Sequence, residues 1–305
     1  MIPRDDYRAL RKVLAENSGH ALADGKEYLV EQRLAPVAEA LGFADLGALL
    51  QRLRTGVDPR IAKRVCEAMT TNESLFFRDG KPFDVLRDHV VPALLERRRH
   101  RRRLRIWSAG CSTGQEAYSI AMTLADPVPR SPEWEVEILG TDYSTEVVVR
   151  ARRGVFNHFE VQRGLPIRML VEHFKPIGSS WQVKDDLKKR VRFEEANLLD
   201  SFARFGTFDV IFCRNVLIYF DRQTRAEVLD RMNDALAPDG YLFLGSSETL
   251  LGVTDRWTAI RGAGTPVFRR ANPEAWDRDG HGRGSPDSTH AHGSPTSVRD
   301  LRTTA

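Results

Sequence analysis

The stretch Leu104-Arg105-Ile106-Trp107-Ser108-Ala109-Gly110-Cys111-Ser112-Thr113-Gly114-Gln115-Glu116 predicts a short strand that turns at glycine into a helix. The helix continues over Gln115–Ala125. Small residues in the turn let the backbone approach a ligand, and the N–H groups that open the helix point toward it. The turn alone is a weak signal, because it is neither a Walker loop nor a clean G-x-G-x-x-G. Ser112 or Thr113 can equally cap the helix, with Glu116 completing a capping box.

Strands and helices alternate along the rest of this part of the chain. The pattern predicts further strands at Val136–Leu139, Val191–Phe193, Phe208–Phe212, Tyr241–Leu244 and Pro266–Phe268, and helices at Ser144–Arg152 and Arg222–Leu236, the last closed by a turn at Ala237–Gly240. Such alternation is typical of α/β proteins with a doubly wound parallel sheet that is covered on both faces. In these sheets, ligands bind at the carboxyl ends of the strands where the strand order reverses.

Two regions depart from this alternation. Residues 1–75 predict a small helical domain, with helices at Ala21–Leu41 and Leu46–Leu53. Residues 154–190 form a longer connection than a simple crossover, with a helix at Ile167–Phe174 and a short strand at Trp181–Val183, and we interpret them as an inserted subdomain on the substrate side. The α/β domain then spans 76–272, and the polar composition of 273–305 predicts a disordered tail.

Composition indicates a soluble globular protein. The 305 residues are 41% hydrophobic and 29% charged, and no run approaches the roughly 18 apolar residues of a membrane span. The first residues lack the apolar segment of a secretory signal, so we expect a cytoplasmic location. Cys66, Cys111 and Cys213 are too far apart for a zinc-ligand pattern, and we expect no metal site.

The densest charge lies in Arg97-Arg98-Arg99-His100-Arg101-Arg102-Arg103, followed by Arg105. We interpret this block as a solvated helix end that runs into the following strand. The alternative is a site for an acidic partner. The block contains no interleaved aromatic residue, so stacking on single-stranded nucleic acid is poorly supported.

Polar residues follow several of the predicted strands. An acid at Asp142 can accept hydrogen bonds from both hydroxyls of an adenosine ribose, or cap the helix that begins at Ser144. Asn197-Leu198 can bind the edge and the face of an adenine, although an asparagine there is more often a turn residue.

The strongest single signal is Phe212-Cys213-Arg214-Asn215-Val216-Leu217-Ile218-Tyr219-Phe220. A charge and an amide that interrupt an apolar run at the end of a buried strand are costly unless they are paired or used. Asn215 can bind the amino-acid end of a cofactor or polarise a substrate carboxyl, and Tyr219 lies one helical turn beyond. The segment Thr70–Arg78 can be read as a helix start capped by Asn72, with Phe76 and Phe77 in a core between the two domains. This interpretation does not explain Arg78, whose charge would lie next to an apolar interface.

Together these segments resemble the chemotaxis receptor glutamate O-methyltransferases of the CheR type, over roughly residues 5–270. The most specific matches are the segments Thr71–Arg78, Ser108–Glu116, Asn197–Leu199, Phe212–Phe220 and Gly240–Glu248, in family order and at family-like spacing.

The resemblance implies a class I, Rossmann-like methyltransferase core with an all-α domain before it and a small β-subdomain at Gly154–Arg190 that helps engage the receptor. It implies that nine residues surround S-adenosylmethionine: Asn72, Ser74, Arg78, Glu116, Asp142, Asn197, Leu198, Arg214 and Asn215. Arg78 and Tyr219 match the pair nearest the transferred methyl group, and the products are glutamate methyl esters and S-adenosylhomocysteine. The implied partner is the cytoplasmic domain of a chemoreceptor, met by a monomer that reaches the membrane only through the receptor.

Two features depart from the family pattern. Gln115 and Ala117 stand where the family often has Glu and Pro. The second helix of the family carries several arginines that dock the receptor, whereas Glu31–Glu39 keeps Arg33 with little other positive charge. The second departure concerns the protein partner and leaves the cofactor residues in place.

The chemistry suits these residue types. A glutamate with a pKa near ~4.3 is already ionised at neutral pH and needs no general base, which fits the lack of a Ser-His-Asp or Cys-His constellation. We expect Arg78 to position the reactants loosely and Tyr219 to donate a directional hydrogen bond. Two other functions remain open: methyl transfer to RNA or a small molecule, and a non-catalytic cofactor-binding scaffold. Against the first, Asn215–Tyr219 lacks the paired prolines and aromatics of many amino-methylating enzymes.

Overall fold

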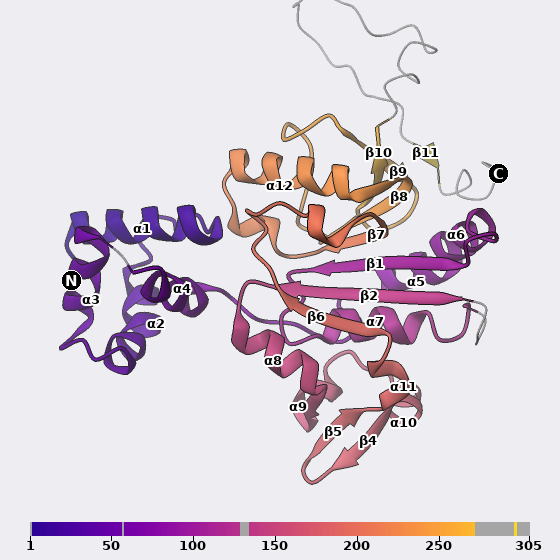
Figure 1. Cartoon of the computed structure of the whole chain (residues 1–305), viewed down its shortest axis with the longest axis horizontal. Coiled ribbons are helices and arrows are strands. Elements are labelled where there is room, and N and C mark those ends of the chain that lie inside the picture. Colours follow the sequence, from indigo (N-terminus) through magenta and orange to yellow (C-terminus); the bar gives the residue numbers. More distant parts are fainter. Residues whose placement is uncertain (1, 57, 129–133, 272–295, 298–305) are drawn as a thin grey trace, which may run out of the picture.

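The computed structural model describes residues 2–56, 58–128, 134–271 and 296–297. Within these ranges, a group of helices at the N-terminal end lies beside a large sheet that has helices on both faces (Figure 1). None of the helices in the described ranges combines the length and apolar composition needed to span a membrane. The predicted disordered tail lies outside the described residues, except for the two-residue strand β11 (Thr296–Ser297).

The N-terminal part consists of α1 (Arg4–Ser18), α2 (Glu27–Ala40), α3 (Leu46–Thr55) and α4 (Pro59–Met69). Their apolar faces pack into a hydrophobic core separate from the cores of the sheet. The predicted helical domain is therefore confirmed. The helix predicted from residue 21 begins only at Glu27, because the chain before it passes through a turn at Gly25, with φ 76°.

A helical segment leads from this part to the sheet. It is formed by α5 (Lys81–Val85), a π-helical turn (Leu86–Val90) and α6 (Val91–Arg97). Pro82 and Pro92 occupy early positions of α5 and α6, where no intrahelical N–H is required.

The main sheet has the strand order β11-β9-β10-β8-β7-β1-β2-β6. Its remaining members are β1 (Arg103–Ala109), β2 (Glu135–Asp142), β6 (Val191–Glu195), β7 (Phe208–Cys213), β8 (Leu236–Leu244), β9 (Trp257–Arg261) and β10 (Val267–Arg270). The strands from β6 to β8 run parallel, whereas β10 is antiparallel to β8 and β9 is antiparallel to β10. The doubly wound sheet is confirmed, with an antiparallel edge that the alternation did not predict. The strand order reverses at β1, between β2 and β7, which puts the expected ligand crevice at their carboxyl ends.

Alternate residues of the parallel strands contribute to two cores on opposite faces. On β7, Val210 and Phe212 belong to the core under α7 (Gln115–Thr123), while Ile211 and Cys213 belong to the core under α12 (Arg222–Ala235). Because both faces are covered, consecutive residues from Val210 to Cys213 are all apolar.

The long connection after α8 (Thr145–Arg153) forms a second sheet. It contains β3 (Val155–Asn157), α9 (His158–Gln162), α10 (Ile167–His173), β4 (Phe174–Ile177), β5 (Ser180–Val183) and α11 (Asp185–Lys188). The three strands pair antiparallel in the order β3-β5-β4. Figure 1 shows this small sheet projecting below the main one.

The turn predicted at Ala237–Gly240 is wrong. These residues belong to β8, which pairs with β7 at Phe208 and again from Val210 onward, with a register shift between. The irregularity accommodates the Pro-Asp-Gly sequence within the strand, and Arg98 binds Asp239 there.

Candidate functional site

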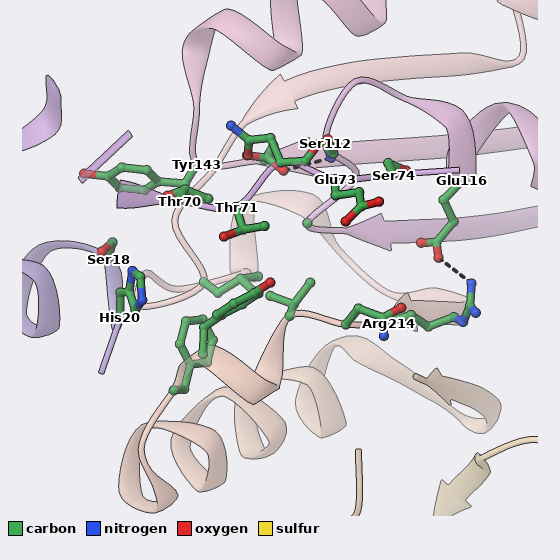
Figure 2. A pocket seen from close by; sticks show the side chains of 18 of the residues that line it. Ser18, His20, Thr70, Thr71, Glu73, Ser74, Ser112, Glu116, Tyr143 and Arg214 are labelled. Carbon is green, nitrogen blue, oxygen red and sulfur yellow. Dashed lines mark hydrogen bonds and ion pairs between the residues drawn. The ribbon is translucent and has the colours of Figure 1, made fainter. Parts of the chain in front are cut away.

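A pocket opens at the carboxyl ends of β1, β2 and β7, at the predicted crevice. The space between its walls, including the part open to solvent, is about 990 Å³. Figure 2 shows its lining side chains, which come from the sheet, from residues 70–78 and from the loop after α1. All ten predicted site residues line it: Asn72, Ser74, Arg78, Glu116, Asp142, Asn197, Leu198, Arg214, Asn215 and Tyr219.

Ser112 holds the turn after β1 in place and does not cap the helix that follows, α7. Ser112 has φ 51°; its N–H donates to Asp142 Oδ2 at 2.8 Å and its hydroxyl to the Asn72 carbonyl at 2.8 Å. The N-cap of α7 is Gly114, and no side chain caps it. The capping-box interpretation is therefore wrong, because Ser112 and Glu116 both bind other parts of the pocket.

Glu116 and Arg214 form an ion pair in the pocket wall. Arg214 Nη1 lies 3.0 Å from Glu116 Oε2 (Figure 2). Ser108 donates to the other carboxylate oxygen at 2.8 Å. Arg214 Nη2 also binds Asp79 at 2.7 Å and the Arg78 carbonyl at 2.8 Å, although the side chain is only 1% exposed. Burial raises the pKa of Glu116, and Arg214 and Ser108 partly offset that rise.

Asp142 ends β2 with a buried carboxyl group that faces the pocket. Its second oxygen accepts the N–H of Ser144 at 3.0 Å, so the acid also supports the start of α8, as the alternative interpretation expected. Burial raises the pKa of Asp142, and the N–H groups of Ser144 and Ser112 partly counteract this effect.

Asn197 joins the two parts of the chain. Its side-chain amide donates to the Asn17 carbonyl of α1 at 2.7 Å, and its oxygen accepts the N–H of Leu199 at 3.1 Å. These bonds favour the turn interpretation for the Asn197 side chain, while Leu198 keeps an apolar surface on the pocket.

Asn215 is strained and has an unused acceptor. Its φ is 60°, which non-glycine residues rarely adopt and which is common at functional sites. Its side-chain oxygen is buried and has no hydrogen-bond partner among the described residues. A buried acceptor of this kind indicates a donor that arrives with a ligand.

Arg78 and Tyr219 are both half-buried in the pocket. In the described part of the chain, the Arg78 guanidinium makes no hydrogen bond or ion pair, whereas both terminal nitrogens of the neighbouring Arg214 are paired. Phe77 and Asp79 flank Arg78 with φ 48° and 66°, so the backbone on both sides of it is strained.

Two pocket residues that sequence reasoning missed come from the end of α1 and the loop after it, Ser18 and His20. The His20 ring meets the Tyr219 ring edge-on, with centroids 5.8 Å apart, and the Ala21 N–H donates to the Tyr219 carbonyl at 2.8 Å. Burial, and then the charge of Arg33, lowers the pKa of His20. No local pattern around His20 reports a contact with a residue about 200 positions away.

The arginine that α2 retains has an internal role. Arg33 donates to the carbonyls of Met69 and Thr70, at 2.6 and 3.2 Å, and to the Thr71 hydroxyl at 3.2 Å. It therefore holds the segment that carries the chain from α4 to the pocket.

The basic block is solvated at Arg99–Arg103, whose side chains are exposed, but Arg98 and Arg105 are paired inside the fold. Arg98, which is 10% exposed, binds Asp209 at 2.9 Å and Asp239 at 2.8 Å, and Arg105 binds Glu137 at 2.8 Å. The prediction of a freely solvated helix end is wrong for these residues, because acids from β2, β7 and β8 meet them across the sheet.

The chain is similar to two family models, CheR methyltransferase, all-alpha domain, over residues 5–70, and CheR methyltransferase, SAM binding domain, over residues 72–264. It is 41% identical to chemotaxis protein methyltransferase Cher2 of Pseudomonas putida, over 84% of this chain and 94% of the relative. It is 37% identical to the chemotaxis protein methyltransferase of Escherichia coli, over 84% and 88%. Among solved structures, a TehB-like SAM-dependent methyltransferase from Corynebacterium glutamicum aligns with a TM-score of 0.35 and 17% identity, over 64% of this chain and 97% of that one.

Proposed function

Because this chain belongs to the CheR methyltransferase family, it is an S-adenosylmethionine-dependent protein-glutamate methyltransferase, and we propose that its acceptors are glutamate side chains in the cytoplasmic domain of a chemoreceptor. The products are glutamate methyl esters and S-adenosylhomocysteine. The enzyme acts in the cytoplasm as a monomer and reaches the membrane only through the receptor. The observation that carries the choice of acceptor is an unpaired Arg78 guanidinium that shares a pocket with Tyr219.

S-adenosylmethionine lies among the nine cofactor residues in this proposal. The free oxygen of Asn215 suits the ammonium of its amino-acid end, and the Asp142 carboxylate suits the ribose hydroxyls. Leu198 supplies an apolar surface for the adenine. The ion pair between Glu116 and Arg214 fixes the pocket wall that these two side chains form. When bound, S-adenosylmethionine supplies a methyl group on a positively charged sulfur.

The acceptor carboxylate needs no base, because a glutamate with a pKa near ~4.3 is ionised at neutral pH. Arg78 attracts and orients it, and the Tyr219 hydroxyl donates a directional hydrogen bond. Charge disappears as the methyl group moves from sulfonium to carboxylate, so a partly dry pocket favours the transition state over the solvated ions. A permanent tight pair with Arg78 would instead stabilise the ground state, which fits a guanidinium held loosely at half burial.

Arg78→Ala and Tyr219→Phe test this assignment. Each variant should lower methyl transfer to receptor-containing membranes roughly 10²-fold, because alignment of the reacting groups is lost. Transfer is measured with radiolabelled S-adenosylmethionine, and base-labile release of the label as methanol identifies the product as an ester.

Arg87→Ala is the matched control, because Arg87 is an exposed arginine that pairs with Asp84 and Asp88. It should keep parental activity, and all three variants should bind S-adenosylhomocysteine. Full activity in both Arg78→Ala and Tyr219→Phe would refute the catalytic roles. Base-stable label would refute glutamate as the acceptor.

A nucleic-acid acceptor is not favoured, because Arg98, Arg101 and Arg105 of the basic block are paired with acids. The proposed domains are the helical domain, 1–75, the methyltransferase domain, 76–272, and the tail, 273–305. In this proposal, the insertion at about 154–190 within the methyltransferase domain contacts the receptor. Its exposed apolar side chains, including Ile167 and Val171 of α10, support a protein partner.

A further inference from the structure

A buried glutamate beyond the predicted site, Glu248, binds the backbone of the turn that carries Tyr219. The residue is 7% exposed and follows β8. Its Oε1 accepts the N–H groups of Val216 and Leu217 at 2.9 and 2.8 Å. Its Oε2 accepts those of Asn215 and Gly245 at 2.9 and 2.7 Å. A carboxylate offers about four acceptor positions, so backbone amides fill this one.

Three of these donors are consecutive, which defines the shape of the turn. The N–H groups of Asn215, Val216 and Leu217 converge on one carboxylate while Asn215 is in the left-handed region, at φ 60°. A 3-10 turn, Leu217–Tyr219, begins there. The first N–H groups of a helical turn have no partner within it, and an acid at that end satisfies them and interacts favourably with the local dipole.

The loop after β8 also fits closely against this turn. A Cβ atom on Gly245 would lie 2.9 Å from Asn215 N and 2.9 Å from Glu248 Oε2. Only glycine lets the carboxylate and the turn approach as they do, so the two loops form one packed unit.

We propose that Glu248 is a positioning residue for methyl transfer. Its carboxylate holds the Asn215–Tyr219 turn in the conformation that directs Asn215 to the cofactor and Tyr219 to the acceptor. Glu248 itself is not among the residues that line the pocket. The inference rests on the proposed roles of Asn215 and Tyr219.

Glu248→Gln is the main test, because it keeps the size of the side chain but turns an NH₂ group toward two N–H donors. We expect the Kd for S-adenosylhomocysteine to rise at least fivefold through Asn215. We expect kcat at saturating S-adenosylmethionine and receptor to fall at least tenfold through Tyr219. Glu248→Asp keeps the charge but shortens the reach, and it should recover part of both losses.

Two further variants separate positioning from simple loss of stability. Gly245→Ala disturbs the same contact without removing the carboxylate, and it should lower kcat even if Glu248→Gln does not fold. Asp209→Asn removes another buried carboxylate, which binds the Arg105 N–H at the opposite end of β7. It should lower the melting temperature but leave kcat and the Kd as in the parent.

The outcomes are distinct. A change in Kd or kcat beyond that of Asp209→Asn supports the positioning role. Parental values of both quantities in every variant of Glu248 and Gly245 that folds, measured below its melting temperature, overturn it. A parent protein that binds S-adenosylhomocysteine but methylates no receptor refutes the proposed function instead, and the Kd of the variants still decides the role of Glu248.

Discussion

Asp142 and Glu116 show how the pocket treats negative charge. Burial raises the pKa of both carboxyl groups, but Glu116 faces Arg214 and Asp142 has mainly backbone N–H partners. A raised carboxyl pKa means that the fold favours the neutral form. The stability that this preference contributes is present below the unfolded pKa, near ~3.9 for Asp, and is lost as pH rises through the folded pKa. Under its proposed role, Asp142 accepts two ribose hydroxyls as an anion, so ligand affinity has the opposite dependence on pH.

We therefore predict that the affinity for S-adenosylhomocysteine falls as pH decreases from neutral through the raised pKa of Asp142, approaching tenfold per pH unit below that pKa. Protonation of Glu116 acts in the same direction. Isothermal titration at each pH measures the affinity. Asp142→Asn should bind more weakly at pH near 8 and show a smaller pH dependence. A flat profile in the parent protein over this range would show that the bound state does not need the anion.

At the scale of elements, the β1 turn and the β7 turn support each other. Gly110, at φ 74°, meets Val216: a Cβ on the glycine would lie 2.4 Å from Val216 Cγ2. The sequence suggested that small residues here admit a ligand. Gly110 does line the pocket, and it also packs against the protein's own turn, the one that Glu248 holds.

Gly110→Ala should consequently displace the β7 turn and weaken S-adenosylhomocysteine binding at least tenfold, about 1.4 kcal/mol. Val216→Ala in the same chain removes the clash and should restore most of the affinity, leaving only the left-handed backbone cost of ~1–2 kcal/mol in stability. Gly178→Ala is the control, since Gly178 also has positive φ, 55°, but nothing lies within 4 Å of its Cβ position. Titration and urea unfolding separate the two effects, and a double variant as weak as Gly110→Ala would contradict this account.

The sequence predicted those strands and helices that a pattern of neighbouring residues reveals. Strands β1, β2 and β7 are apolar runs bounded by turn residues, and their polar ends meet in one pocket because parallel strands end at the same edge. Strands β3 and β4 escaped prediction because they are three and four residues long, too short to reveal a period. His20 and Glu248 escaped because their roles depend on contacts with residues 219 and 215–217, which no local pattern encodes.

At the scale of the whole molecule, the pocket lies between the core of the N-terminal helices and the two cores of the sheet. The N-terminal helices have their own core, and few polar contacts connect them to the sheet, including Lys63 to Glu195 at 2.7 Å and Asn197 to Asn17 at 2.7 Å. Ser18, His20 and Thr70 bring the N-terminal part to the pocket wall. A ligand in the pocket therefore contacts both parts at once.

We predict that S-adenosylhomocysteine at about 100 times its Kd stabilises the protein by ~2.7 kcal/mol and slows hydrogen exchange in α1 and α4 as well as at the strand ends. Mass spectrometry of exchange resolves these segments. Lys63→Ala should speed exchange in α4 without ligand, and ligand should largely reverse the change. Protection restricted to the sheet would show that the N-terminal helices do not close the pocket.

The unpaired state of Arg78 also bears on how a catalytic cycle ends. An acceptor glutamate enters as an anion and leaves as an ester, and S-adenosylhomocysteine leaves without the sulfonium charge. Under its proposed role, Arg78 attracts the glutamate anion but not the neutral ester. No acid among the described residues pairs with Arg78, so its charge is available to the incoming glutamate. Methylation thus removes the attraction that recruited the substrate. Departure of the ester is eased by the reaction itself, and sites that are already modified compete poorly with those still awaiting a methyl group.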